Sequence, residues 1–201
     1  TGHRTQAQYF YEESPQYGNL IKSIELGEVD INSGSDLDAS DNRSSFVEYL
    51  YNSDNYLIGV PKTSYLKDYT GDILKQSWFY YDNQGYGVPP TLGNLTKQED
   101  YLEGGINPAT TFTYDGFGNL LTTTDALTHP TTIEYESDYH LFPLKTTNAL
   151  GHSVKTIYYG INDNQTTGEY IDLYPNQGIG LWGQVKQTTD TNNVTSSTIY
   201  D

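Results

Sequence analysis

An acidic run between residues 30 and 38 holds the side chains best suited to bind a cation. Asp30, Asn32, Asp36 and Asp38 place oxygen ligands at alternating positions, as calcium-binding loops do. The glycine of the common calcium loop stands sixth, whereas Gly34 is fifth here, and no helix is predicted on either side. A solvated surface loop therefore competes with a calcium site, and the sequence indicates no other cofactor.

Other residues of catalytic type lack the spacing that their chemistry needs. The histidines are scattered and form no HExxH motif, and the serines form no G-x-S-x-G elbow. Glu134 and Glu136 are two residues apart, so on a strand they would share one face, and we expect that face to be the solvated one. We therefore expect no enzymatic activity.

Aromatic side chains provide the clearest candidates for binding. Trp78 and Trp182 stand apart from each other, and tyrosines occur in pairs such as Tyr80-Tyr81. Neighbouring residues of a strand point to opposite faces, so one ring of each pair could stack on a glycan or contact a protein receptor. The competing interpretation is that these rings form cross-strand ladders that hold a sheet together.

The composition narrows the class of protein further. Tyrosine occurs 20 times and aromatic residues make up 14% of the chain, which is untypical of disorder. The formal net charge of -16 disfavours nucleic acid and anionic membranes as partners. There is no cysteine, and no apolar run is long enough to span a membrane.

Two phrases recur along the chain. The clearest copy of the first contains Tyr114-Asp115 and then Gly118-Asn119-Leu120. Looser copies pair Tyr11 with Gly18-Asn19 and Tyr81 with Gly93-Asn94, and Tyr200 opens a further one. The second phrase begins at Tyr51 and again at Tyr135, which is 135 minus 51, or 84, residues later. This recurrence indicates duplication of a structural unit.

The phrases predict β-hairpins. Thr111 and Thr113 alternate with Phe112 and Tyr114, as in a strand with one packed and one solvated face, and the Asp-Gly and Gly-Asn pairs favour tight turns. We therefore predict an all-β chain of antiparallel hairpins over residues 1–201. An irregular acidic loop at 27–45 and an irregular insert at 160–180 interrupt it. At least one edge of the sheet should be unpaired.

In these phrases the chain resembles the Rhs and YD-repeat family, which includes bacterial polymorphic toxins, the B and C components of insecticidal toxin complexes and, more distantly, the teneurins. The resemblance implies a curved, spiralling sheet strip that forms part of a hollow shell around a toxin. It also implies a secreted or cell-surface location, with other segments of one large protein or toxin-complex subunits as partners. The absence of methionine, with Thr1 as the first residue, fits a piece of a longer chain. The alternative is an adhesin-like repeat that binds glycan or protein through Tyr and Trp.

Overall fold

The computed structural model describes residues 4–13, 17–161 and 183–198. It divides into two compact units, an N-terminal unit of residues 1–110 and a C-terminal unit of residues 111–201. Within each unit the strands lie in chain order, and each pairs antiparallel with its sequence neighbour. Because consecutive antiparallel strands reverse direction, successive connections alternate between the two ends of the sheet.

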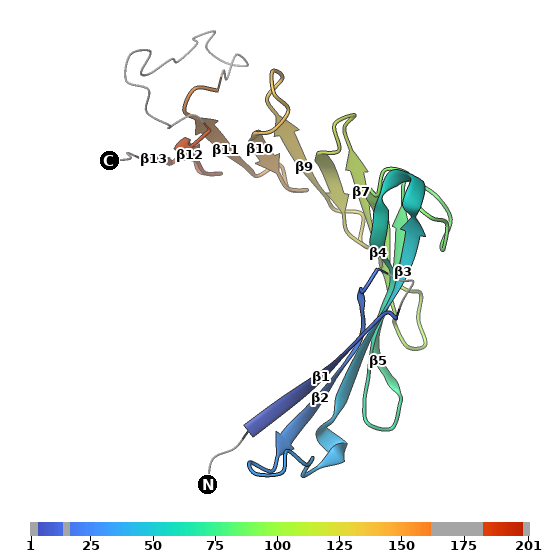
Figure 1. Cartoon of the computed structure of the whole chain (residues 1–201). Coiled ribbons are helices and arrows are strands. Elements are labelled where there is room, and N and C mark those ends of the chain that lie inside the picture. The colour runs from blue at the N-terminus through green and yellow to red at the C-terminus, as the bar shows by residue number, and fades with distance from the viewer. Residues whose placement is uncertain (1–3, 14–16, 162–182, 199–201) are drawn as a thin grey trace. The chain divides into compact units, whose positions relative to one another are not determined.

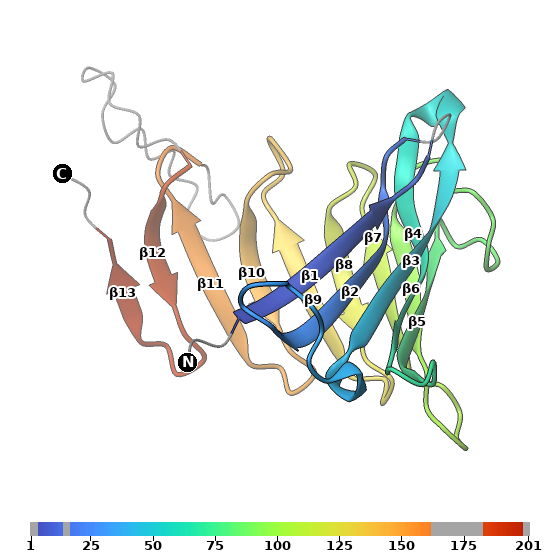
Figure 2. The same ribbon diagram turned by 60° about the horizontal axis from the view of Figure 1, so that its bottom comes forward.

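The N-terminal unit is a six-stranded meander (Figures 1 and 2). Its elements are β1 (Arg4–Tyr11), β2 (Leu20–Val29), η1 (Ala39–Asp41), β3 (Arg43–Asn52), η2 (Ser53–Asn55), β4 (Leu57–Lys67), β5 (Ile73–Tyr81) and β6 (Leu95–Asp100). The two η elements are single turns of 3-10 helix within the β2–β3 and β3–β4 connections. The sheet therefore supplies nearly all of the regular structure described in this unit.

The C-terminal unit repeats the same arrangement with shorter strands. They are β7 (Ala109–Tyr114), which starts at the border of the unit, β8 (Leu120–Thr124), β9 (Pro130–Tyr135), β10 (Pro143–Thr147), β11 (Ser153–Tyr158), β12 (Val185–Thr189) and β13 (Thr195–Ser197). Threonines lie opposite each other in the registers Thr111↔Thr124 and Thr122↔Thr132, where their branched Cβ suits the pleated strand.

Each unit is a single sheet layer, with no second sheet or packed helix among the described residues (Figure 2). As a result, few apolar residues are buried in the described ranges, namely Val29, Leu50, Tyr81, Pro90 and Ile161. Aromatic rings and lysine side chains of neighbouring strands pack on one another on the face of the sheet. Phe46 of β3 stacks on Tyr65 of β4 with 4.8 Å between ring centroids, and the Nζ of Lys22 lies 5.3 Å from the Phe46 ring.

The prediction of an all-β chain of antiparallel hairpins is confirmed. The predicted bounds of the acidic loop are wrong, because β2 continues to Val29 and β3 begins at Arg43. Its strand residues pair across the hairpin, as Arg43 does with Glu25. The outer edge of β1 has no partner strand in the described part of its unit. The insert predicted at 160–180 lies almost wholly outside the described residues.

Candidate functional site: the hairpin turns and the ties between them

The turn between β7 and β8 shows what the Tyr-Asp and Gly-Asn-Leu phrase builds. The carboxylate of Asp115 accepts hydrogen bonds from the backbone N–H groups of Phe117 and Asn119, each at 2.9 Å. Gly118 has φ +88°, in the left-handed region that glycine adopts without steric cost. The Asn119 side-chain amide, followed by the backbone N–H groups, lowers the pKa of Asp115. Asp115 is thus the acceptor around which the turn closes.

The same turn recurs with different residues. In each copy the first side chain accepts the N–H groups two and four positions later, and the fourth residue has positive φ. The further copies are Asp68–Asp72, Asp125–His129, Asn148–His152 and Asp190–Val194. Sequence reasoning missed all four. The spacing of Asp or Asn ahead of Gly71 and Gly151 was a usable signal, whereas Thr128 at a positive φ of 67° gave none.

Longer turns are closed by a carboxylate that accepts still more backbone N–H groups. Asp82 accepts four of them, from residues 91–94. Glu136 accepts four, from residues 138, 139, 141 and 142, and is 2% exposed. Burial alone raises the pKa of Glu136, but these N–H groups outweigh it and lower the pKa. The prediction that Glu136 shares a solvated face with Glu134 is therefore wrong.

The asparagine of the Gly-Asn pair connects its own turn to the neighbouring one. The Nδ2 of Asn119 donates to the Asp115 carboxylate at 2.9 Å and to the carbonyl oxygen of His140 at 2.6 Å. Asn19 does the same with Glu12 at 3.2 Å and the carbonyl of Ile58 at 2.8 Å. A primary amide has two N–H donors, and both are used. Aspartate has no donor to offer here, which explains the asparagine.

Further amides extend these ties in the N-terminal unit. Asn52 donates to the carbonyl of Pro90 at 2.8 Å, and Asn55 donates to the carbonyl of Thr91 at 2.6 Å. All these ties involve residues in, or within two residues of, connections that follow odd-numbered strands. Within each unit they therefore lie at one end of the sheet, here named the tied rim. The other end, here named the free rim, carries the β2–β3, β4–β5, β8–β9, β10–β11 and β12–β13 connections.

The predicted repeat tyrosines occupy unequal environments. Tyr81 is 7% exposed, and its hydroxyl donates to the carbonyl of Pro61 at 2.8 Å. Tyr51, Tyr114 and Tyr135 are half-buried, and burial raises the pKa of Tyr114. Tyr11 is 56% exposed, so it has no core role in this unit.

The other predicted repeat positions also differ from one another in their structural roles. Gly18 and Gly93 have φ of +77° and +85°, as their turns require, and Leu120 is half-buried. Asn94 joins its turn through its backbone N–H, which donates to Asp82 at 2.9 Å. Tyr200 lies outside the described residues.

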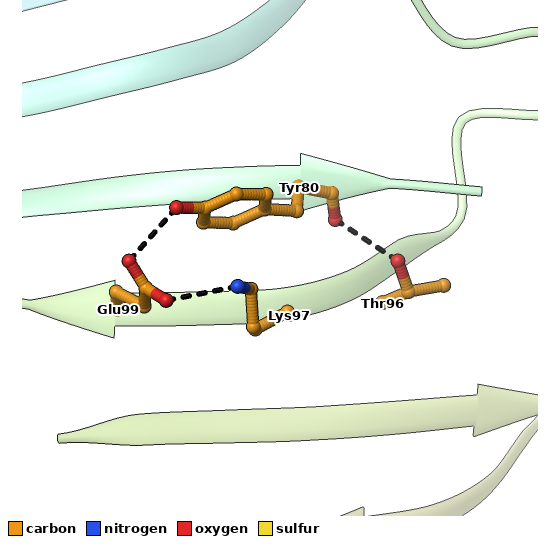
Figure 3. A network of polar contacts seen from close by, with 4 residues as sticks. All are labelled: Tyr80, Thr96, Lys97 and Glu99. Atoms are coloured by element: carbon orange, nitrogen blue, oxygen red, sulfur yellow. Dashed lines mark hydrogen bonds and ion pairs between the residues drawn. The ribbon is translucent and has the colours of Figure 1, made fainter. Parts of the chain in front are cut away.

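A polar cluster that sequence reasoning did not predict lies on β5 and β6 (Figure 3). The Tyr80 hydroxyl donates to Glu99 at 2.8 Å, and Lys97 Nζ donates to the same carboxylate at 2.8 Å while lying 3.7 Å from the Tyr80 ring centroid. Burial, followed by the bond to Glu99, raises the pKa of Tyr80 to about 12. The ring, cation and carboxylate link β5 to β6, and the predicted ladder of paired tyrosines stays a prediction.

The predicted calcium ligands do not converge, and glycan stacking by the two tryptophans stays a prediction. Trp78 is half-buried in β5, and Trp182 lies outside the described residues. Asp30 accepts from the N–H groups of Asn32 and Ser33, and Asp38 accepts from Ser40. The other two predicted ligands make different contacts. The carboxylate of Asp36 accepts a hydrogen bond from Asn42, and the Asp36 backbone forms an isolated β-bridge with Val29. Asn32 donates its backbone N–H to Asp30. No group of three or more metal-ligating residues converges anywhere in ranges 4–13, 17–161 and 183–198.

Comparison with solved structures gives matches that cover nearly all of this chain. They include the TcdB2-TccC3-Cdc42 crystal structure (14% identity, 98% of this chain, TM-score 0.37) and the Photorhabdus luminescens Tc holotoxin pore with a TccC3 mutation (15%, 98%, 0.36). TcdB2-TccC3-TEV is also similar (16%, 95%, 0.34). This chain spans 10% of each of those chains. TM-scores below 0.5 do not establish a common fold.

Comparison with protein families identifies one segment. Residues 91–129 match the RHS Repeat model, and this segment holds Tyr114-Asp115, Gly118-Asn119 and the Asp125 turn. No curated protein matches the chain. Within the described ranges no helix is long and apolar enough to cross a membrane. Residues 91–129 of the chain are therefore similar to an RHS repeat.

Proposed function

We propose that this chain is a structural wall module of a larger RHS-repeat protein, in which tied hairpins enclose or scaffold a toxin or other cargo. The observation that carries the proposal is the double donation of Asn19 and Asn119, each to its own turn carboxylate and to the neighbouring loop. Such ties resist the lateral separation of neighbouring hairpins, which a wall that encloses a cargo must also resist.

The exposure of the sheet supports the same function. Ile73 and Leu74 are neighbours on β5 and so point to opposite faces, and they are 43% and 51% exposed. Each unit has a single layer in its described part. A single layer with two accessible faces suits a partition between two compartments better than a self-contained globule.

The proposal also concerns partners and location. The unpaired edge of β1 presents backbone N–H and C=O groups to another strand, and we assign it to another segment of the same protein or to a toxin-complex subunit. We place the protein outside the cell or on its surface, and we assign this module no catalytic step.

The test uses the full-length protein that contains this chain together with its cargo. Replacing both Asn19 and Asn119 with alanine removes two ties, each worth about 1 kcal/mol, so we expect protease digestion of the cargo to become about tenfold faster or more. Asn94→Ala is the matched control, because the Asn94 side chain makes no hydrogen bond among the described residues. If the cargo of the parent protein is digested as fast as free cargo, enclosure is wrong.

A further inference from the structure

A row of charged side chains crosses the C-terminal unit on one face of its sheet. Lys145 of β10 lies opposite Glu134 of β9 and, on its other side, opposite Lys155 of β11. Cross-strand partners project from the same face. The Nζ of Lys145 lies 2.7 Å from the Oε1 of Glu134. Lys155 is exposed and has no ion pair in the part of the chain that the structure describes.

This juxtaposition is unfavourable without a counterion. Like charges directly opposite on neighbouring strands destabilise a sheet. Carboxylates are abundant partners for lysine in this chain, which has 26 Asp and Glu residues and 10 Lys and Arg residues. Lys145 and Lys155 nevertheless lie opposite each other, and among the described residues Glu134 of β9 forms an ion pair with Lys145 alone.

A hollow of about 490 Å³ lies over the same strands. Ser153 and Thr189 contribute to its lining, together with the two lysines. Thr147 also lines the hollow, but its Oγ1 is buried, so a molecule in the hollow does not reach this hydroxyl. Thr147 is two residues from Lys145, so both side chains point to the same face of β10.

We propose that this hollow binds the carboxylate of an acidic side chain in a polypeptide, held by Lys155 and Lys145. Two lysines and Glu134 leave a net charge of one positive unit in the lining. That charge matches a carboxylate, whereas a phosphate monoester carries about -1.5 to -2 at neutral pH. This proposal does not depend on the proposed wall function.

The probe is the peptide acetyl-Gly-Glu-Gly-amide, compared with its glutamine counterpart. It is titrated at near-physiological salt into the whole isotope-labelled chain, followed by NMR. We expect saturable shifts at Lys145, Thr147 and Lys155 with the glutamate peptide only. Equal shifts with the glutamine peptide would overturn the proposal, as would tighter binding of glucuronate or inorganic phosphate.

Substitutions distinguish binding in this hollow from a general attraction of the peptide to positive charge on the chain. Lys155→Gln should weaken binding about tenfold, the usual effect of losing one hydrogen bond to a charged group. Thr147→Val should change binding less than about twofold, because the buried hydroxyl does not reach the ligand. Lys75→Gln changes the same charge at an exposed strand lysine of the other unit and should have less than a twofold effect. Equal losses from Lys75→Gln and Lys155→Gln would refute the site. Lys155→Gln should leave Tm unchanged or higher, because it removes repulsion, so its loss of binding is not unfolding.

Discussion

Both rims of each unit close turns on a side-chain acceptor, and they differ in how neighbouring turns are connected. On the tied rim, amides such as Asn19 and Asn119 donate to carbonyl oxygens of the next connection. On the free rim, the side chains of Asp68, Asp125 and Asp190 bond only within their own connections among the described residues. A hollow of about 400 Å³ lies between the 125–129 and 148–152 turns.

The difference shows that closing a hairpin and spacing hairpins are separate tasks. A carboxylate acceptor closes a turn, and it does so on both rims. Spacing requires a donor that reaches beyond the turn, which the second N–H of an asparagine amide supplies. We therefore expect local opening to begin at the free rim, where lateral hydrogen bonds between connections are missing from the described structure.

The largest effect is expected at the buried turn carboxylate of the tied rim. Glu136→Ala leaves four backbone N–H groups without their acceptor, so the free energy of unfolding should fall by about 3 kcal/mol. Urea unfolding of the chain measures this. Glu134→Ala is the matched control, since Glu134 makes an exposed ion pair and should cost less than about 1 kcal/mol. Equal costs would show that Glu136 does not hold the turn.

A smaller effect is expected from the tie itself. Asn119→Ala removes the bonds to Asp115 and to the His140 carbonyl and should lower the free energy of unfolding by about 1–2 kcal/mol. Hydrogen exchange should then accelerate in the 136–142 connection as well as in the 115–119 turn. Faster exchange confined to 115–119 would mean that Asn119 stabilises its own turn without tying the neighbouring one.

The fold was predictable because its signals are local. Alternating Thr and aromatic residues specify strands, and Gly118-Asn119 after Asp115 specifies a turn. The ties were not predictable, because Ile58 and Pro90 accept through backbone carbonyls, which any residue provides. Glu136 was misplaced for a related reason. Strand alternation continued past the last strand residue, Tyr135, whereas the chain turns there and encloses the carboxylate.

The smallest effect is expected when acid is added, and it should distinguish the 125–129 turn from the 148–152 turn. Both turns lie on the free rim and share one geometry. The backbone N–H of His129 is the largest cause that lowers the pKa of Asp125 below its ordinary value of 3.8. A carboxyl with a lowered pKa stabilises the folded state above its ordinary pKa, and this contribution is lost as the pH falls through the folded value. Asn148 accepts the equivalent N–H groups at 3.0 Å with an amide oxygen that does not titrate in this range.

Acidification below about pH 4 should therefore loosen the 125–129 turn before the 148–152 turn. Hydrogen exchange, corrected for the intrinsic effect of pH, measures this at Leu127 and His129 against Leu150 and His152. Asp125→Asn should abolish the difference between the turns, because both would then close on an amide. A difference that survives Asp125→Asn would mean that neighbouring groups, and not the turn carboxylate, give the free rim its sensitivity to acid.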